Sequence, residues 1–296
     1  MSAKVYPYNF KAKGNPIITH MRTADPSAHV WADGKLWLYP SHDQDDATDY
    51  KTMDGYHVFS TSDLVNWTDY GEVLHSRNVP WALSGWMWAP DCAYKNGIYY
   101  LYFPAKDKTG QWRIGVATST VPEGPFIPEA NYIIGTNGID PSCFMDDDGQ
   151  AYLYFGQALV AKLKDNMKEL AEPPREIDYG ATNFREGVWM HKRNGIYYYS
   201  YVDYKSTVDH GFYSMGDNPY GPFAYKGGIN KPIRKAQDHH SIVEYKGVWY
   251  YFYHLGDYDG GDATRRNVAV EYLYYNDDGT MKPIVQTQDG VKEVKG

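Results

Sequence analysis

The chain has 296 residues, of which 43% are apolar, 22% charged and 17% aromatic. Two domains of ordinary size would fit this length, although sheet-rich folds often exceed roughly 200 residues as one unit. With 29 Lys and Arg against 37 Asp and Glu, the net charge of −8 argues against nucleic acid or an anionic membrane as partner, because both attract clustered basic side chains. The two cysteines, Cys92 and Cys143, are too few for a disulfide scaffold and lack the spacing of metal ligands.

Long apolar segments are missing from the sequence. No run approaches the roughly 18 apolar residues that cross a bilayer. The N-terminal MSAKVYPYNF also lacks the apolar stretch of a secretory signal peptide. We therefore expect a cytoplasmic protein without a membrane partner, or a secreted one if a leader has been removed from the sequence.

Aromatic side chains gather in short runs along the chain. Tyrosine alone accounts for 30 residues, and tyrosine and tryptophan favour strands. In chain order the runs lie at 37–39, 99–103, 152–155, 197–201 and 249–253. The best candidate for a helix is 159–170, where leucine and methionine recur at helical spacing, but a strand followed by a turn is the alternative. The pattern predicts an all-β fold.

Each aromatic run forms the second half of a repeated unit. A short strand, a turn with glycine and the aromatic strand follow one another five times, around Gly34, Gly97, Gly149, Gly195 and Gly247. The turns read DG, NG, DG, NG and KG, and Asn-Gly or Asp-Gly between alternating apolar residues is a strong hairpin signal. The glycine spacings of 63, 52, 46 and 52 residues fit a four-stranded propeller blade with variable loops. We predict one five-bladed β-propeller domain over residues 1–296, with no appended module.

An ionisable residue precedes each hairpin at a similar distance. These positions hold Asp25, Asp91, Asp140, Glu186 and the cluster Asp238-His239-His240. Singly they have ordinary explanations, since an aspartate before proline is typical of turns. In a propeller, however, the first strand of each blade lines the axis, so that residues at equivalent positions converge at one end of it. Like charges held close together destabilise a fold, which favours a functional explanation for the whole set.

Converging carboxylates beside tryptophans, without a phosphate or cofactor motif, are typical of glycoside hydrolysis. That reaction needs a carboxylic acid to protonate the leaving oxygen and a carboxylate to activate water or attack. The acid stays protonated near neutral pH only if burial or a neighbouring anion raises its pKa. Four tryptophans near the polar positions offer flat faces for sugar rings, although packing in the blades is the alternative for at least half of them: Trp31, Trp86, Trp88 and Trp189.

At these positions the sequence resembles glycoside hydrolase family 43, the five-bladed propeller enzymes that act on arabinose- and xylose-containing plant polysaccharides. The matching stretches are TADPSAHVWADGKLWLY (23–39), WAPDCAYKNGIYYLYF (88–103), IDPSCFMDDDGQAYLYFG (139–156), REGVWMHKRNGIYYYSY (185–201) and HHSIVEYKGVWYYFYH (239–254). The resemblance implies Asp25 as general base, Glu186 as general acid and Asp140 as the residue that raises the pKa of the acid and orients it. It also implies inversion of the anomeric centre, in agreement with the need for two carboxyl groups about 6.5–9.5 Å apart with water between them.

Further residues are expected to contact the substrate. The resemblance implies an arginine of the last blade against the sugar, Arg266 or Arg265. We add Trp88, Trp31 and His239 as substrate-binding candidates. Asp91, in the motif WAPD, is interpreted as structural.

The resemblance also implies a calcium ion or other cation near the axis, beside His240 or His239. Calcium prefers oxygen ligands, so we expect a largely hydrated ion in a structural role. The chemistry itself requires no cofactor.

We expect an exo-acting enzyme that releases xylose, arabinose or both from short xylo- or arabinoxylo-oligosaccharides, with a small oligosaccharide as its partner. The insertion at 42–55 and the loop at 76–86 are predicted to wall off its pocket. The sequence leaves two alternatives to this function. One is a carbohydrate-binding propeller without catalysis, since fold alone does not give function, and the other is an endo-arabinanase of the same family.

Overall fold

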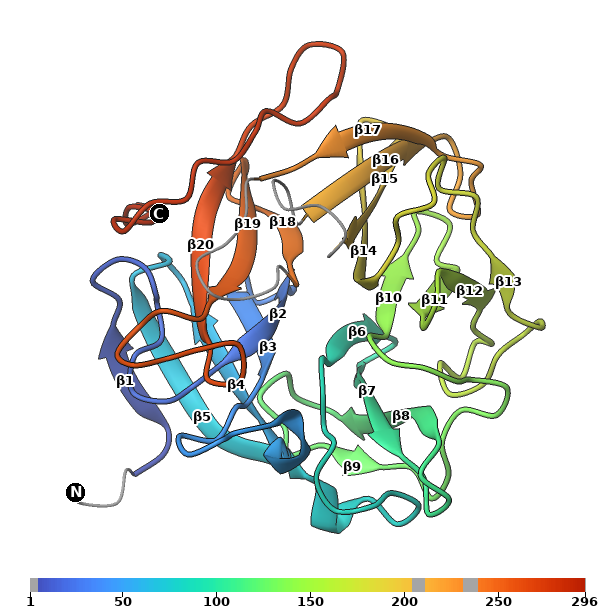
Figure 1. Ribbon diagram of the computed structural model, residues 1–296, viewed down its shortest axis with the longest axis horizontal. Helices are drawn as coiled ribbons and strands as arrows, with labels where there is room; N and C mark the ends of the chain where they lie inside the picture. The colour runs from blue at the N-terminus through green and yellow to red at the C-terminus, as the bar shows by residue number, and fades with distance from the viewer. Residues whose placement is uncertain (1–4, 204–210, 231–238, 296) are drawn as a thin grey trace.

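The computed structural model describes residues 5–203, 211–230 and 239–295. Five antiparallel sheets stand around one central axis as the blades of a β-propeller, with β2, β6, β10, β14 and β18 nearest the axis (Figure 1). The predicted all-β, five-bladed fold is confirmed. Within these residues, no helix combines the length and the apolar character needed to span a membrane.

The blades follow one another in chain order. Blade 1 consists of β1 (Tyr8–Lys11), β2 (Ala24–Val30), β3 (Leu36–Ser41), β4 (Gly55–Thr61) and β5 (Asn66–His75). Blade 2 consists of β6 (Asp91–Lys95), β7 (Ile98–Lys106), β8 (Trp112–Ser119) and β9 (Ile127–Pro128). Blade 3 consists of β10 (Ser142–Met145), β11 (Ala151–Phe155), β12 (Leu159–Lys162) and β13 (Arg175–Glu176). Blade 4 consists of β14 (Glu186–Arg193), β15 (Ile196–Val202), β16 (Gly211–Gly216) and β17 (Ala224–Gly228), and the described part of blade 5 of β18 (Ser241–Tyr245), β19 (Val248–Leu255) and β20 (Asn267–Leu273).

The predicted hairpins join the first two strands of every blade. In three of them both turn residues have positive φ, as a two-residue type I′ turn requires: Asn96-Gly97, Asn194-Gly195 and Lys246-Gly247. The segment 159–170, our best candidate for a helix, is instead β12 followed by a turn, closed by a bridge between Leu163 and Leu170. The strand-and-turn alternative is therefore confirmed.

The aromatic second strands pack on both of their faces. In β11, Tyr152 and Tyr154 belong to the core between blades 3 and 4, whereas Leu153 and Phe155 belong to the core between blades 2 and 3. The other blades show the same division, so that five apolar layers lie between five blades. Because successive strand residues point to opposite faces, a strand buried on both faces needs an uninterrupted apolar or aromatic run.

The N-terminal segment closes the ring between blades 5 and 1. Strand β1 pairs with β5 on the outside of blade 1. The chain then runs along β20, where Ile17 N donates to Val268 O (2.9 Å) and Thr23 N donates to Arg266 O (2.9 Å). The side chain of Asn15 hydrogen-bonds both backbone groups of Val270. This segment covers the outer edge of blade 5 before it enters β2.

Asp91 connects three inner strands near the axis and is only 1% exposed. Its Oδ1 accepts hydrogen bonds from Ser27 Oγ (2.5 Å) and the backbone N of Cys92 (2.7 Å), and it lies 2.7 Å from His29 Nε2. Its Oδ2 accepts a hydrogen bond from the backbone N of Cys143 (2.6 Å). A single carboxylate thereby holds β2, β6 and the start of β10 together, which agrees with our interpretation of Asp91 as structural.

We predict that Asp91→Ala destabilises the protein by about 3 kcal/mol, because several buried donors lose their acceptor at once. The thermal unfolding midpoint, followed by circular dichroism, should fall by roughly 5–10 °C. The matched control Asp165→Ala removes a carboxylate that is 96% exposed and should leave the midpoint unchanged. Equal midpoints for the two variants would show that Asp91 does not hold the inner strands together.

Candidate active site

The predicted carboxylates lie at one end of the propeller axis, where the inner strands begin. Asp25 is the second residue of β2, Asp140 immediately precedes the Pro141 that leads into β10, and Glu186 is the first residue of β14. His239 precedes β18 and lies at the same end, 3.5 Å from Asp25. We call this the carboxylate end and the opposite end, where the hairpins turn, the hairpin end.

Irregular backbone sets the direction of these side chains. Asp25 and Asp140 have φ values of 47° and 57°, a left-handed conformation that is uncommon for residues other than glycine. The pairing of β2 with β3 shifts register between Ala24 and Ser27, around Asp25. The pairing of β14 with β15 shifts between Glu186 and Trp189. Such bulges redirect a side chain out of the regular ladder, here at two of the three carboxylates.

Asp25 is 6% exposed and surrounded by hydrogen-bond donors and cations. Its Oδ2 accepts a hydrogen bond from Ser41 Oγ (2.5 Å), and its Oδ1 lies 3.0 Å from Arg266 Nη1. His239 Nδ1 and His254 Nδ1 lie 3.5 Å and 3.6 Å from the same oxygen. Burial alone would raise the pKa of Asp25, but Arg266, His239, His254 and Ser41 together lower it to about 2. Asp25 is therefore ionised at neutral pH, as a general base must be.

Arg266 is clamped by a second aspartate that the sequence did not reveal. Asp43 is fully buried, and its two oxygens accept bonds from Arg266 Nη2 (2.8 Å) and Nε (2.9 Å). The backbone N of Arg266 donates to Asp43 as well (2.8 Å). This bidentate contact fixes the guanidinium plane and leaves Nη1 directed at Asp25. Arg266 is only 2% exposed, so its direct action is on Asp25, and a contact with the sugar stays a prediction.

Arg266 and Arg265 differ in their partners, since Arg266 pairs with Asp25 (3.0 Å). Arg265 pairs with Asp262 (2.8 Å) and keeps 32% of its side chain exposed.

Asp140 and Glu186 form a coupled acidic pair. Asp140 is 5% exposed, and its Oδ2 accepts a hydrogen bond from the backbone N of Gly187 (3.0 Å), the residue after Glu186. Burial, and then the negative charges of Glu186 and Asp25, raise the pKa of Asp140 well above its ordinary value. Two close carboxyl groups do not both ionise easily, and their protons belong to the pair rather than to either residue. The raised pKa of Asp140 therefore favours retention of a proton by the pair, and Glu186 is its less buried member.

The two neighbouring histidines face different surroundings. His239 contacts Asp25 and also lies against the α-carbon of Gly187, where a Cβ would approach His239 Cγ to 3.4 Å. His240 is 1% exposed, lies 2.9 Å from Ser200 Oγ through its Nε2 and stacks on Tyr251 at 4.9 Å. His239 is thus the histidine of the carboxylate end. The ring of His240 packs between blades 4 and 5, and its role as a metal ligand stays a prediction. Asp238 lies outside the described residues.

The two predicted sugar-binding tryptophans lie at opposite ends of the axis. Trp88 precedes β6 at the carboxylate end, where its Nε1 donates to Tyr50 O (2.9 Å) and its ring contacts Trp112 at 4.4 Å. Trp31 follows β2 at the hairpin end and stacks on His29 at 4.8 Å. Six residues of strand separate it from Asp25, a length of about 20 Å. The prediction that Trp31 contributes to the carboxylate site is therefore wrong. Trp31 is close to Asp25 in sequence, but β2 runs along the axis and carries it away from the carboxylates.

The loops predicted to wall the site contact one another. The backbone N of Trp86 donates to Lys51 O (3.3 Å), and that of Met87 donates to Met53 O (2.8 Å). Tyr50 OH donates to Ala263 O (2.9 Å), three residues before Arg266. The insertion at 42–55 thus lies between the loop at 76–86 and the segment that carries Arg266.

A closed metal site is not evident in the described part of the chain. Among residues 5–203, 211–230 and 239–295, no three His, Cys, Asp or Glu side chains are grouped so that they could hold an ion. The side chains near His239 therefore provide too few ligand oxygens to hold a calcium ion mainly through the protein.

Comparisons with known proteins agree with this geometry. The family model for glycosyl hydrolases family 43 matches residues 13–281. Xylosidase/arabinosidase 43A of Humicola insolens is 43% identical, covering 90% of this chain and 99% of the relative. Xylosidase/arabinosidase of Bacteroides ovatus is 41% identical, covering 87% of this chain and 93% of the relative.

Solved structures show the same likeness. CoXyl43, a β-xylosidase/α-arabinofuranosidase from a compost microbial metagenome solved with xylotriose in a calcium-free form, has a TM-score of 0.86 and 40% identity, covering 94% of this chain and 98% of its own. An enzyme of Xanthomonas citri has a TM-score of 0.85 and 40% identity, covering 93% and 94%. The chain therefore belongs to glycosyl hydrolase family 43 and is a glycoside hydrolase built on a five-bladed propeller.

Proposed function

We propose that this enzyme is an inverting exo-hydrolase that releases xylose, arabinose or both from short xylo- or arabinoxylo-oligosaccharides. The observation that carries the proposal is the contrast between Asp25, whose pKa is lowered to about 2, and the Asp140–Glu186 pair, in which the pKa of Asp140 is raised. Two carboxyl groups in opposite protonation states are the requirement for acid–base glycoside hydrolysis. The names of the relatives favour pentosides over other sugars and do not favour a propeller that only binds carbohydrate.

In the proposed mechanism, Asp25 takes a proton from a water molecule as that water attacks the anomeric carbon. Glu186 gives its proton to the glycosidic oxygen as the bond from that oxygen to the anomeric carbon breaks. The new bond forms on the opposite face, so the product is inverted. Before the reaction, Asp140 and Glu186 do not both ionise easily, so that the pair keeps the proton that Glu186 donates. Asp140 also orients the backbone next to Glu186, because its Oδ2 accepts a hydrogen bond from Gly187 N. Exchange of protons with solvent then restores the starting state.

The proposed function also includes a cation near the axis, for which the protein offers few ligands. The relative CoXyl43 is described in a calcium-free form, and His239 is the histidine at the carboxylate end. Because the described donor set is small, we expect a cation here to be held mainly by water molecules, with His239 as its protein contact, and to act on site structure through its positive charge.

The roles of Glu186 as acid and Asp25 as base can be distinguished by changing the leaving group of the substrate. Nitrophenolate leaves with little help from an acid, whereas a sugar alcohol needs a proton. Glu186→Ala should therefore lose roughly 10²–10⁴-fold in kcat on xylobiose and much less on nitrophenyl β-xyloside or nitrophenyl α-L-arabinofuranoside. Asp25→Ala should lose a similar factor on all three, because water must be activated in each case.

Glu169→Ala, which removes a carboxylate that is 55% exposed, is the control and should keep full activity. Proton NMR should show the inverted anomer as the first product. Equal losses for Glu186→Ala on all substrates, or retention of configuration, would contradict the assignment. Internal oligosaccharides released from debranched arabinan without free pentose would instead indicate an endo-arabinanase.

The second prediction concerns the alkaline limb of the pH–activity profile. Removal of the Asp140 charge lowers the pKa of its partner, so the acid loses its proton at lower pH. Asp140→Asn should therefore move the alkaline limb of kcat/KM on xylobiose to lower pH by about one unit or more. Asp147→Asn, a change at an aspartate that is 84% exposed, should leave the limb in place. An unmoved limb in Asp140→Asn would exclude the proposed role.

The third prediction concerns the acidic limb. Arg266 lowers the pKa of Asp25, so its loss raises that pKa and the base becomes protonated at higher pH. Arg266→Met should move the acidic limb upward by about 1–3 pH units, and Ser41→Ala should move it in the same direction by less. Arg265→Met is the matched control and should not move it. If both arginine variants behave alike while circular dichroism shows intact folds, Arg266 does not hold Asp25 ionised.

A further inference from the structure

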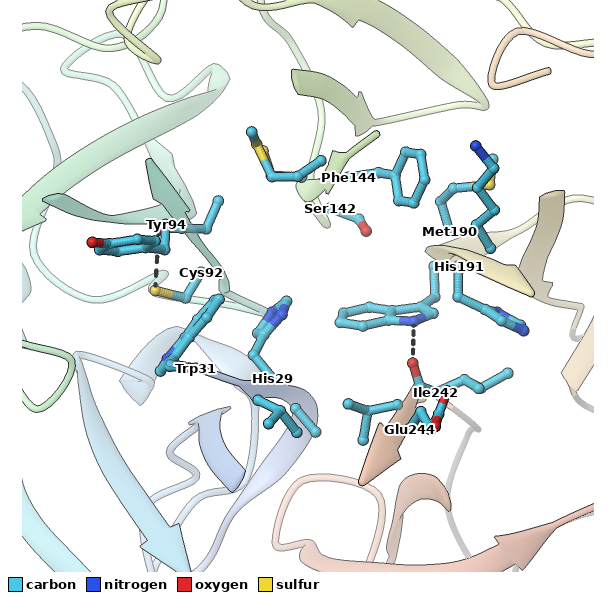
Figure 2. A pocket seen from close by; sticks show the side chains of 18 of the residues that line it. His29, Trp31, Cys92, Tyr94, Ser142, Phe144, Met190, His191, Ile242 and Glu244 are labelled. Atoms are coloured by element: carbon cyan, nitrogen blue, oxygen red, sulfur yellow. Dashed lines mark hydrogen bonds between the residues drawn. The ribbon is translucent and has the colours of Figure 1, made fainter. Parts of the chain in front are cut away.

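A cavity lies at the hairpin end of the axis. Its volume is about 490 Å³, within the range of about 300–1,000 Å³ usual for small-molecule sites. Figure 2 shows side chains from the inner strands of all five blades around it. The lining residues lie along these strands and in the turns that follow them, at 28–32, 92–94, 142–145, 189–192 and 242–244, joined by Asp147 and by Trp249 of β19. None of the three carboxylates assigned to catalysis is among them.

Side chains that meet across the axis separate this cavity from the carboxylate end. Trp189 of blade 4 lies 5.4 Å from His29 of blade 1, although these blades are not neighbours in the ring. Trp189 Nε1 donates to Ile242 O of blade 5 (2.9 Å), and His29 lies 2.7 Å from Asp91. His29 and Trp189, which line the cavity, thus form its floor on the side of the carboxylate end.

The walls present aromatic surface to the interior. Trp31 and Tyr94 lie on one side, with ring centroids 6.4 Å apart, and Tyr94 is 40% exposed. Phe144 and Trp249 also line the cavity and are partly exposed. Trp31 is held in place because its Nε1 donates to Tyr39 OH (3.0 Å). Fixed, flat and partly exposed aromatic faces suit the apolar faces of sugar rings.

The charges at the rim argue against an anionic occupant. Lys192 Nζ is paired with Asp146 (2.8 Å) and Asp147 (2.7 Å), so its charge is already matched. Glu244, which is exposed, adds a further carboxylate to the lining. The rim thus has an excess of acceptors over cations. An uncharged ligand with many hydroxyl groups matches acceptors at the rim and aromatic faces below them, whereas phosphorylated or acidic ligands do not.

We propose that the cavity at the hairpin end is a second, non-catalytic binding site for a short neutral saccharide, separate from the hydrolytic site. The sugar stacks on Trp31 and Tyr94 and donates hydroxyl hydrogen bonds to Glu244 and Asp147. The choice of a xylose oligomer as the probe rests on the proposed function. The evidence for the cavity and for the kind of ligand it suits is independent of that function.

Calorimetric titration with xylotriose tests the site in the Glu186→Ala protein, in which hydrolysis is suppressed. The additional change Tyr94→Ala should weaken one class of binding about tenfold, through loss of an aromatic contact. Glu244→Gln should weaken the same class to a lesser degree. Tyr274→Ala, which removes an aromatic ring that is 57% exposed outside the cavity, should leave the titration unchanged.

Identical titrations for Tyr94→Ala, Glu244→Gln and Tyr274→Ala would overturn the second site. In the otherwise unmodified enzyme, Tyr94→Ala should hydrolyse nitrophenyl β-xyloside at the original rate, and a tenfold loss of kcat would show that the two ends are not separate. Absence of turnover in the unmodified enzyme would defeat the proposed function alone, because the effect of Tyr94→Ala on binding does not depend on catalysis.

Discussion

The packing of each blade against both of its neighbours is the constraint on which the rest of the structure depends. A strand such as β11 has aromatic or apolar side chains on both faces, with Tyr152 and Tyr154 on one and Leu153 and Phe155 on the other. Such a sheet cannot leave either face in water without a large loss of buried apolar surface. The ring must therefore close, and Asn15 and Ile17 cover the last open edge, along β20. The position of the acidic residues on the axis follows from this closure.

Ring closure brings acidic residues together, and the protein stabilises each of them differently. Asp25 stays charged beside Arg266 and His239. Asp140 is buried beside other carboxylates, which raises its pKa and favours a proton held by the pair that it forms with Glu186. Asp91 is satisfied by donors from three inner strands. One residue type near the start of the inner strands of three blades thereby serves as a base, as part of a proton-holding pair and as a structural link, according to its surroundings.

Sequence reasoning succeeded where the signal is local or repeated. The glycine turns predicted the hairpins, and the repeat placed Asp25, Asp140 and Glu186 at one end of the axis. It failed where the answer depends on three-dimensional contacts. Asp43 lies in an insertion rich in aspartate, and only its contact with Arg266, 223 positions away, distinguishes it. The separate surroundings of His239 and His240 could not be predicted either, because the backbone turns neighbouring residues in different directions.

The irregular backbone at the carboxylate end is itself a means of alignment. The bulge around Asp25 accompanies a backbone N–H that donates to His254 Nδ1 of blade 5 (3.0 Å). The bulge after Glu186 contains Gly187, whose N–H donates to Asp140 Oδ2 in front of blade 3. Gly187 has a φ of 68°, and a Cβ there would approach Val202 Cγ2 to 2.7 Å, so glycine suits this position. In a regular strand pair these N–H groups would donate hydrogen bonds within their own blade. At the two bulges they donate instead to the neighbouring blade or to the residue in front of it. The distortions that turn the carboxylates toward the axis thus also fix their positions relative to one another.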